Sequence, residues 1–291
     1  MKYRTVIKLL IPLIGLLALF AVMMGLFYQT SGRPYPLTSF RGERVMINGH
    51  GLYFYDTVST AAQMQANDLI TLVVGLPLLI ISTWQALRGS LRGRLLLTGT
   101  LGFFLYTYMS MSMLTAYNSL FLVYVALFGL SLYAFILGML SFDLEDLPSH
   151  FSAHLPHGWI AGVLFAMGGF LFLAWMGRII PPLMKSTTPA LENTTTMVIQ
   201  VMDLVLIMPL AILSGLLLLR RTAWGYLLAS VTVLKGLTMA LAVSTMGINM
   251  ALNGVSDSSV LMIIFLVLTF LNLISVALLL KNIDVIQKVT P

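Results

Sequence analysis

The sequence contains no cysteine and few charged residues. The absence of Cys among its 291 residues excludes disulfides, thiolate metal sites, cysteine nucleophiles and iron–sulfur clusters. Only 9% of the residues are charged, against about 25% in an ordinary soluble domain. Hydrophobic residues make up 59% of the chain. This composition predicts a membrane protein that crosses the bilayer several times.

The apolar residues form runs long enough to cross a hydrocarbon core, for which about 20 helical residues are needed. We therefore expect an all-α membrane protein with about eight transmembrane helices. The first run follows Lys2, Arg4 and Lys8 as in a signal peptide, but it is too long and no A-x-A-like cleavage site follows. It is predicted to be an uncleaved first helix. The eight runs are 5–28, 68–88, 95–117, 119–142, 158–178, 198–220, 223–247 and 259–281.

The basic residues predict the orientation. The net charge is +6, yet these residues gather at the ends of apolar runs, so no nucleic-acid partner is expected. By the positive-inside rule, most of them lie inside if both termini are cytoplasmic. Trp159, Trp175 and Trp224 fall near the predicted interfaces, as in an aromatic belt. The inside set is Lys2, Arg4, Lys8, Arg88, Arg92, Arg94, Arg220, Arg221, Lys281 and Lys288; the outside set is Arg33, Arg41, Arg44, Arg178 and Lys185.

A shift of 132 residues superimposes several non-leucine positions and predicts an internal repeat. Both copies would enter the membrane with the same polarity, which makes the repeat parallel, as in one class of transporters. The chain would then comprise a first four-helix repeat at 1–146 with an outward loop at 29–67, a cytoplasmic linker at 147–157 and a second four-helix repeat at 158–291. The matched pairs are Pro77/Pro209, Ser82/Ser214, Arg88/Arg220, Gly93/Gly225, Thr100/Thr232 and Ser112/Ser244.

Lys235 stands alone near the middle of an apolar run. A lone ammonium at the bilayer centre costs roughly 2.5–3.5 kcal/mol on insertion scales, so it is normally paired, hydrated or functional. Asp203 is the expected partner in a direct ion pair, and Asp68 is the second choice. Two readings remain open: a packing ion pair that orients two helices, or a ligand or proton site reached from outside. In the repeat, Lys235 corresponds to Phe103.

Hydroxyl side chains complete the predicted ligand-binding set. Tyr106 and Ser110 recur at near-helical spacing and could line a hydrated cavity, and Thr238 follows Lys235 by about one turn. The alternative for each hydroxyl is interhelical hydrogen bonding, worth only about 0.6 kcal/mol on average. The predicted ligand-binding residues are Lys235, Asp203, Asp68, Tyr106, Ser110 and Thr238.

No metal, cofactor or catalytic residue is predicted. His150 and His154 have zinc-compatible spacing, but Pro148 and Pro156 interrupt the segment. Retinal attachment to Lys235 is disfavoured because Val231 stands where microbial rhodopsins commonly carry Asp or Ser. An enzyme is disfavoured, although not excluded.

Short motifs resemble a group of bacterial multi-pass membrane proteins without an assigned function. The motifs are Trp224-Gly225-Tyr226 with Lys235-Gly236, the helix start from Asp203 to Pro209, and Tyr117-Asn118. The resemblance implies the cytoplasmic (inner) membrane of a bacterium and no particular chemistry.

The sequence favours a transporter-like protein that binds or moves a small, anionic or lipid-like solute through an outward-facing cavity near Lys235. Its expected partners are membrane lipids and that solute. The alternatives are a non-transporting scaffold or sensor subunit, and a membrane enzyme acting on lipid-linked substrates.

Overall fold

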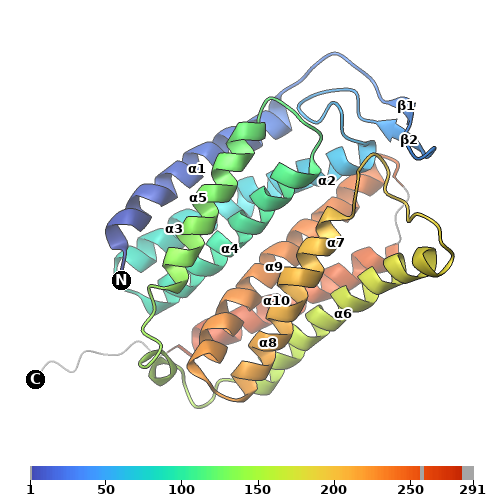
Figure 1. The fold of residues 1–291 in the computed structure, drawn as a ribbon. Helices are drawn as coiled ribbons and strands as arrows, with labels where there is room; N and C mark the ends of the chain where they lie inside the picture. The colour runs from blue at the N-terminus through green and yellow to red at the C-terminus, as the bar shows by residue number, and fades with distance from the viewer. Residues whose placement is uncertain (1, 256–258, 284–291) are drawn as a thin grey trace, which may run out of the picture.

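The computed structural model describes residues 2–255 and 259–283, which form a bundle of long helices with one short hairpin (Figure 1). Within these residues, seven helical stretches are long and apolar enough to cross a membrane. They indicate a multi-pass membrane protein. The stretches are Arg4–Phe27 (α1), Val58–Leu87 (α2, η1 and α3), Phe121–Met139 (α5), His157–Met184 (α6), Val198–Leu219 (α7, η3 and α8), Ala223–Leu252 (α9) and Ile263–Lys281 within α10 (Ser259–Lys281).

The remaining predicted crossing is α4 (Leu91–Leu114), which is long enough but less apolar than the others. It contains Arg92 and Arg94 and several hydroxyl side chains. Thr98, Thr100 and Thr107 are nevertheless buried, because α4 packs between other helices. Polar residues are tolerated on a helix that contacts protein on most sides. Eight crossings therefore stay a prediction.

Two of the long helices contain a π-helical turn immediately before a proline. The first consists of α2 (Val58–Ile70), η1 (Thr71–Gly75) and α3 (Leu76–Leu87). In η1 the Leu76 amide donates to the Thr71 carbonyl, five residues back, and Pro77 follows. Proline lacks an amide hydrogen and clashes with the carbonyl four residues earlier, so a wider turn relieves the conflict.

The second long helix repeats this arrangement with α7 (Val198–Met202), η3 (Asp203–Ile207) and α8 (Met208–Leu219), followed by α9. Pro209 follows η3 as Pro77 follows η1, and the two π-helical turns begin 132 residues apart. Ser90 and Thr222 cap α4 and α9 by accepting hydrogen bonds from the amides of Gly93 and Gly225. The same succession of elements thus occurs in both halves.

At one end of the bundle lies the hairpin of β1 (Tyr35–Thr38) and β2 (Arg44–Ile47), which pair antiparallel. We call this the hairpin end (Figure 1). The predicted outward loop 29–67 is wrong at its C-terminal side, because α2 already begins at Val58. Thr57 caps that helix by accepting a hydrogen bond from the Thr60 amide, and alanines favour its continuation.

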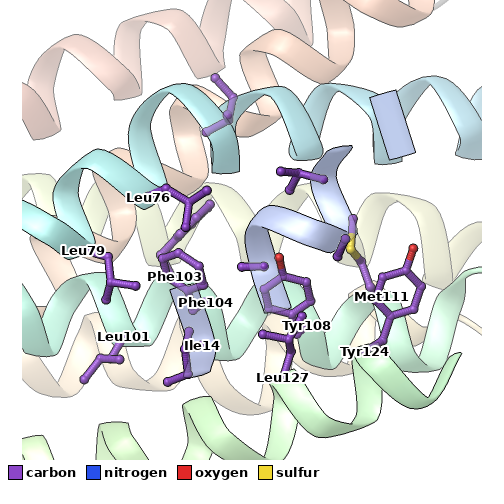
Figure 2. Close-up of a cluster of buried hydrophobic side chains, with 14 of the residues drawn as sticks. Ile14, Leu76, Leu79, Leu101, Phe103, Phe104, Tyr108, Met111, Tyr124 and Leu127 are labelled. Atoms are coloured by element: carbon purple, nitrogen blue, oxygen red, sulfur yellow. The ribbon is translucent and has the colours of Figure 1, made fainter. Parts of the chain in front are cut away.

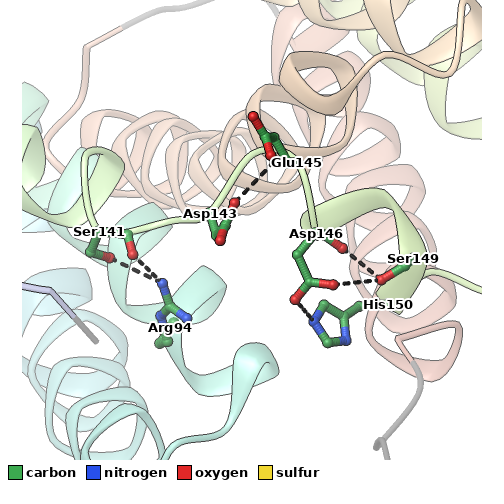
Figure 3. Close-up of polar contacts among 7 residues, drawn as sticks. All are labelled: Arg94, Ser141, Asp143, Glu145, Asp146, Ser149 and His150. Atoms are coloured by element: carbon green, nitrogen blue, oxygen red, sulfur yellow. Dashed lines mark hydrogen bonds and ion pairs between the residues drawn. The ribbon is translucent and has the colours of Figure 1, made fainter.

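The opposite end carries the N-terminus and the linker between α5 and α6, so we call it the linker end (Figure 1). The linker contains the 3₁₀ turn η2 (Leu147–His150). Asp146 accepts hydrogen bonds from Ser149 and contacts His150, and Arg94 of α4 donates to the Ser141 carbonyl (Figure 3). Linker and bundle are thus fastened by polar contacts. Lys288 lies outside the described residues.

The centre of the molecule is the pair α4 and α9. In α9, 78% of the apolar window is buried, against 22–39% in the other candidate spans. The two helices approach closely at Gly99, where an added Cβ would come within 2.4 Å of Leu234. One apolar cluster lies on the α1, α3 and α5 side of this pair (Figure 2), and a second lies on the α6 and α8 side.

Candidate functional site

A cavity of about 520 Å³ runs from the middle of α9 to the loop before α7. It lies among α2, α4, α6, α7 and α9, and we call it the Lys235 cavity. It reaches the surface, since the exposed Thr196 is among its lining residues. Its polar lining includes Gln63, Asn67, Thr107, Ser110 and Gln200; its apolar lining includes Phe103, Leu171, Met239, Ala242, Val243, Met246 and Phe265.

Lys235 lies at the inner end of this cavity with only 6% of its surface exposed. Its Nζ is 3.7 Å from the centre of the Tyr106 ring and donates a hydrogen bond to the Met239 sulfur at 2.8 Å. The electron-rich ring face and the polarizable sulfur both favour a cation. Neither neutralises its charge, so the ammonium can still bind an anion.

Asp203 lies in the π-helical turn η3 and is 1% exposed. Its Oδ1 accepts a hydrogen bond from the Tyr106 hydroxyl at 2.6 Å, and its Oδ2 accepts one from Trp175 Nε1 at 3.0 Å. Both carboxylate oxygens are therefore engaged by neutral donors.

The expected direct ion pair between Lys235 and Asp203 is wrong for this structure, in which the described residues show no salt bridge joining them. Tyr106 contacts both groups instead, with its ring under the ammonium and its hydroxyl on the carboxylate. The charges are thus linked through the aromatic side chain. The gap matters because it leaves the Lys235 ammonium open to the cavity.

The other predicted residues divide into two groups. Ser110 lines the cavity, although its hydroxyl already donates to the Thr107 carbonyl at 2.7 Å. Thr238 does not line the cavity, because its hydroxyl donates to the Lys235 carbonyl at 2.9 Å within the same helix. Asp68 does not line it either: its carboxyl points to the opposite side of α2, toward α1 and Tyr53.

Sequence reasoning missed Trp175, whose indole donates to Asp203 inside the bundle and does not serve only as a membrane-interface anchor. It also missed the amide side chains of Gln63 and Gln200, on two helices far apart in the sequence. Only the repeat offered a signal, because it pairs the helices that carry these two residues. No periodicity indicates Trp175.

The mouth of the cavity is formed by contacts between the hairpin and the loop before α7. Arg41 donates to the carbonyls of Thr194 and Thr195, at 2.9 and 2.8 Å. Glu43 accepts hydrogen bonds from the amides of Leu191 and Glu192. Two loops from different halves of the sequence are thereby joined beside the cavity entrance.

Comparison with protein-family profiles, with curated proteins and with solved structures finds no match to this chain. The resemblance to bacterial multi-pass proteins therefore stays a prediction. In the part of the chain that the structure describes, no group of three or more His, Asp or Glu side chains is arranged to hold a metal ion. The site offers one buried ammonium, several amide and hydroxyl groups, and a long apolar wall.

Proposed function

We propose that this protein binds a small amphipathic anion in the Lys235 cavity and carries it across the membrane. The observation that supports this proposal is a buried ammonium with no carboxylate in direct contact, at the inner end of a cavity of about 520 Å³. Pockets of roughly 300–1,000 Å³ are typical of small-molecule sites. An anionic group of the solute would pair with Lys235.

The cavity lining defines the rest of the solute. Gln63, Asn67 and Gln200 offer hydrogen bonds along one side, whereas Met246 and Phe265 contribute to an apolar wall. A solute with one charged group and an apolar body satisfies both surfaces. Asp203 has the role of holding Tyr106 and balancing the charge of Lys235 when the cavity is empty.

The distribution of charge supports an orientation with both termini in the cytoplasm. Arg88, Arg94 and Arg220 lie at the linker end, and Arg33 and Arg41 lie at the hairpin end, with the majority of basic residues in the first group. The hairpin end then faces outward, and so does the cavity mouth. The cell would be bacterial and the membrane its inner one.

The two halves supply the architecture of a parallel repeat, which is one arrangement of transporters. Each half contains a π-helical turn, a proline and a capped central helix at an offset of 132 residues. The proposed parallel repeat relates α4 to α9, so that the solute binds beside the central pair of helices.

The test uses the absence of cysteine in the chain. Ser110→Cys places one thiol in the cavity near Lys235, and the thiol is treated from outside with an anionic or a cationic methanethiosulfonate of similar size. We expect the anionic reagent to react faster, and this preference to disappear in Ser110→Cys with Lys235→Met. Thr238→Cys is the control, because that side chain is buried away from the cavity and should stay unmodified.

Equal rates for the two reagents, unaffected by Lys235→Met, would contradict the proposal. So would protection of Ser110→Cys from both reagents. Either result would favour a non-transporting scaffold or sensor subunit with dry packing around Lys235.

A further inference from the structure

A second buried acid, Asp68, lies in the first half of the chain and takes no part in the Lys235 cavity. It is 1% exposed, and its Oδ2 is 2.6 Å from the Tyr53 hydroxyl, which donates to it. Gly25 of α1 packs directly against the carboxyl: an added Cβ there would come within 1.9 Å of Oδ2. The absence of a side chain at Gly25 is what leaves room for this carboxyl.

No cation balances this group within residues 2–255 and 259–283, where Asp68 forms no salt bridge. Its titratable neighbours are tyrosines: Tyr53 from the loop before α2, Tyr108 from α4 and Tyr124 from α5. On the α1 side it meets Gly25. A carboxylate with one hydrogen bond in such surroundings costs several kcal/mol, so the carboxyl instead takes up a proton.

The tyrosines near Asp68 have unused hydrogen-bonding capacity. The hydroxyls of Tyr108 and Tyr124 are buried and have no hydrogen-bond partner in the described structure. Their rings stack with centroids 6.4 Å apart, and Figure 2 shows both hydroxyl oxygens pointing to the same side. Buried polar groups are nearly always satisfied, so these hydroxyls indicate a place where a proton or a water molecule is passed on.

Asp56 connects this cluster to the hairpin end. It lies in the loop before α2, its amide donates to the Tyr53 carbonyl, and its Oδ1 accepts from the Ala116 amide at 2.9 Å. Its Oδ2 is buried without a partner. Burial raises the pKa of Asp56 to about 7, so this carboxyl can take up and release protons near neutrality. Tyr124 lies within electrostatic range of both Asp56 and Asp68.

We propose that Asp68 is a proton-binding site, separate from the Lys235 cavity and filled from the hairpin end through Asp56, Tyr124 and Tyr53. A proton from outside water is taken up by Asp56 and passed on until the Asp68 carboxylate becomes a carboxylic acid. No other bond changes. The contact between Tyr53 and Asp68 survives this step, because either oxygen can carry the shared hydrogen. A role of this proton in driving solute movement rests on the proposed function, whereas the proton site itself does not.

The test is infrared spectroscopy of the full-length protein in lipid nanodiscs without solute. We expect a C=O stretching band of a protonated carboxyl at neutral pH, and its loss in Asp68→Asn. Asp143→Asn, which removes an exposed linker carboxyl, should leave the band intact. Tyr53→Phe keeps the carboxyl but removes its hydrogen bond, so it should shift the band to higher frequency. This second variant keeps the test decisive if Asp68→Asn fails to fold.

The route is tested by mixing the protein with D₂O, which shifts the same band as deuterium replaces the proton. Asp56→Asn should slow this exchange on the order of a hundredfold, as loss of a positioned proton carrier typically does. Persistence of the band in Asp68→Asn, or its insensitivity to Tyr53→Phe, would overturn the site. Unchanged exchange in Asp56→Asn would overturn the route. Neither result depends on the labelling of Ser110→Cys, so the two proposals can fail separately.

Discussion

The two halves of the molecule use the same backbone arrangement for different purposes. In the second half, the positions on η3 and α9 hold Asp203 and Lys235 beside an open cavity. The equivalent positions in the first half hold Thr71 and Phe103. Phe103 packs against Gly75, where an added Cβ would lie 2.7 Å from its ring. The π-helical turn is thus common to both halves, and only the second carries the charges.

The buried acids of the two halves differ in the same sense. Asp203 has a lysine nearby and two neutral donors on its carboxylate. Asp68 has one tyrosine donor and no cation in the described part of the chain. The comparison predicts that charge removal damages the second half most, whereas pH and packing changes act on the first half.

The largest effect is expected for Asp203→Asn. The Lys235 ammonium would lose its balancing charge and Trp175 would face an amide, which typically costs about 3–5 kcal/mol for a buried pair. The double change with Lys235→Met should recover much of that loss. Unfolding in detergent measures both. A double variant no more stable than Asp203→Asn would contradict the electrostatic link, and Asp143→Asn is the neutral control.

A pH effect is expected in the first half from Asp56. Its pKa rises from 3.8 to about 7 on folding, so the folded state binds the proton more tightly than the unfolded state. Stability is therefore present at low pH and is lost as the pH rises from about 4 to 7, by an amount on the order of 4 kcal/mol. Asp56→Asn should flatten this part of a melting-temperature profile. A profile with the same slope in the variant would show that Asp56 does not cause it.

A packing effect is expected at the contact between Gly25 and Asp68. Gly25→Ala forces a methyl group against the carboxyl and should destabilise the protein by about 1–3 kcal/mol. Combination with Asp68→Ala should cost less than the sum of the single changes. Gly169→Ala is the matched control, because nothing lies near its added Cβ in α6. Additive costs would mean that Gly25 and Asp68 do not touch.

The smallest effect is expected at Thr71, the first-half counterpart of Asp203. Its hydroxyl is fully buried without a partner, so Thr71→Val should leave stability unchanged or raise it by less than about 1 kcal/mol. Thr232→Val is the control, since it breaks the hydrogen bond to Ser214 and should cost about 1 kcal/mol. A clear loss for Thr71→Val would give that hydroxyl a role the comparison denies it.

Much of the fold could be predicted from the sequence because long apolar runs and prolines act locally. Helices occupy the predicted runs, and Lys235 is buried in mid-helix as expected. The start of α2 at Val58 was missed because the segment after Thr57 is only moderately apolar and owes its burial to neighbouring elements. The site was predicted only in part, since the place of Tyr106 between Lys235 and Asp203 depends on how α4 packs against α9 and η3.

The central claim is that the Lys235 ammonium binds an anionic solute, and it is tested most directly by a binding titration. Octyl sulfonate and octyl trimethylammonium are compared on the protein in nanodiscs, with the fluorescence of Trp175 as the reporter and Trp175→Phe to assign it. The account predicts tighter binding of the sulfonate, weakened roughly tenfold to a hundredfold by Lys235→Met, as for loss of a charged hydrogen bond. Lys281→Met should have no effect. Equal binding of the two probes, or sulfonate binding unchanged in Lys235→Met, would contradict it.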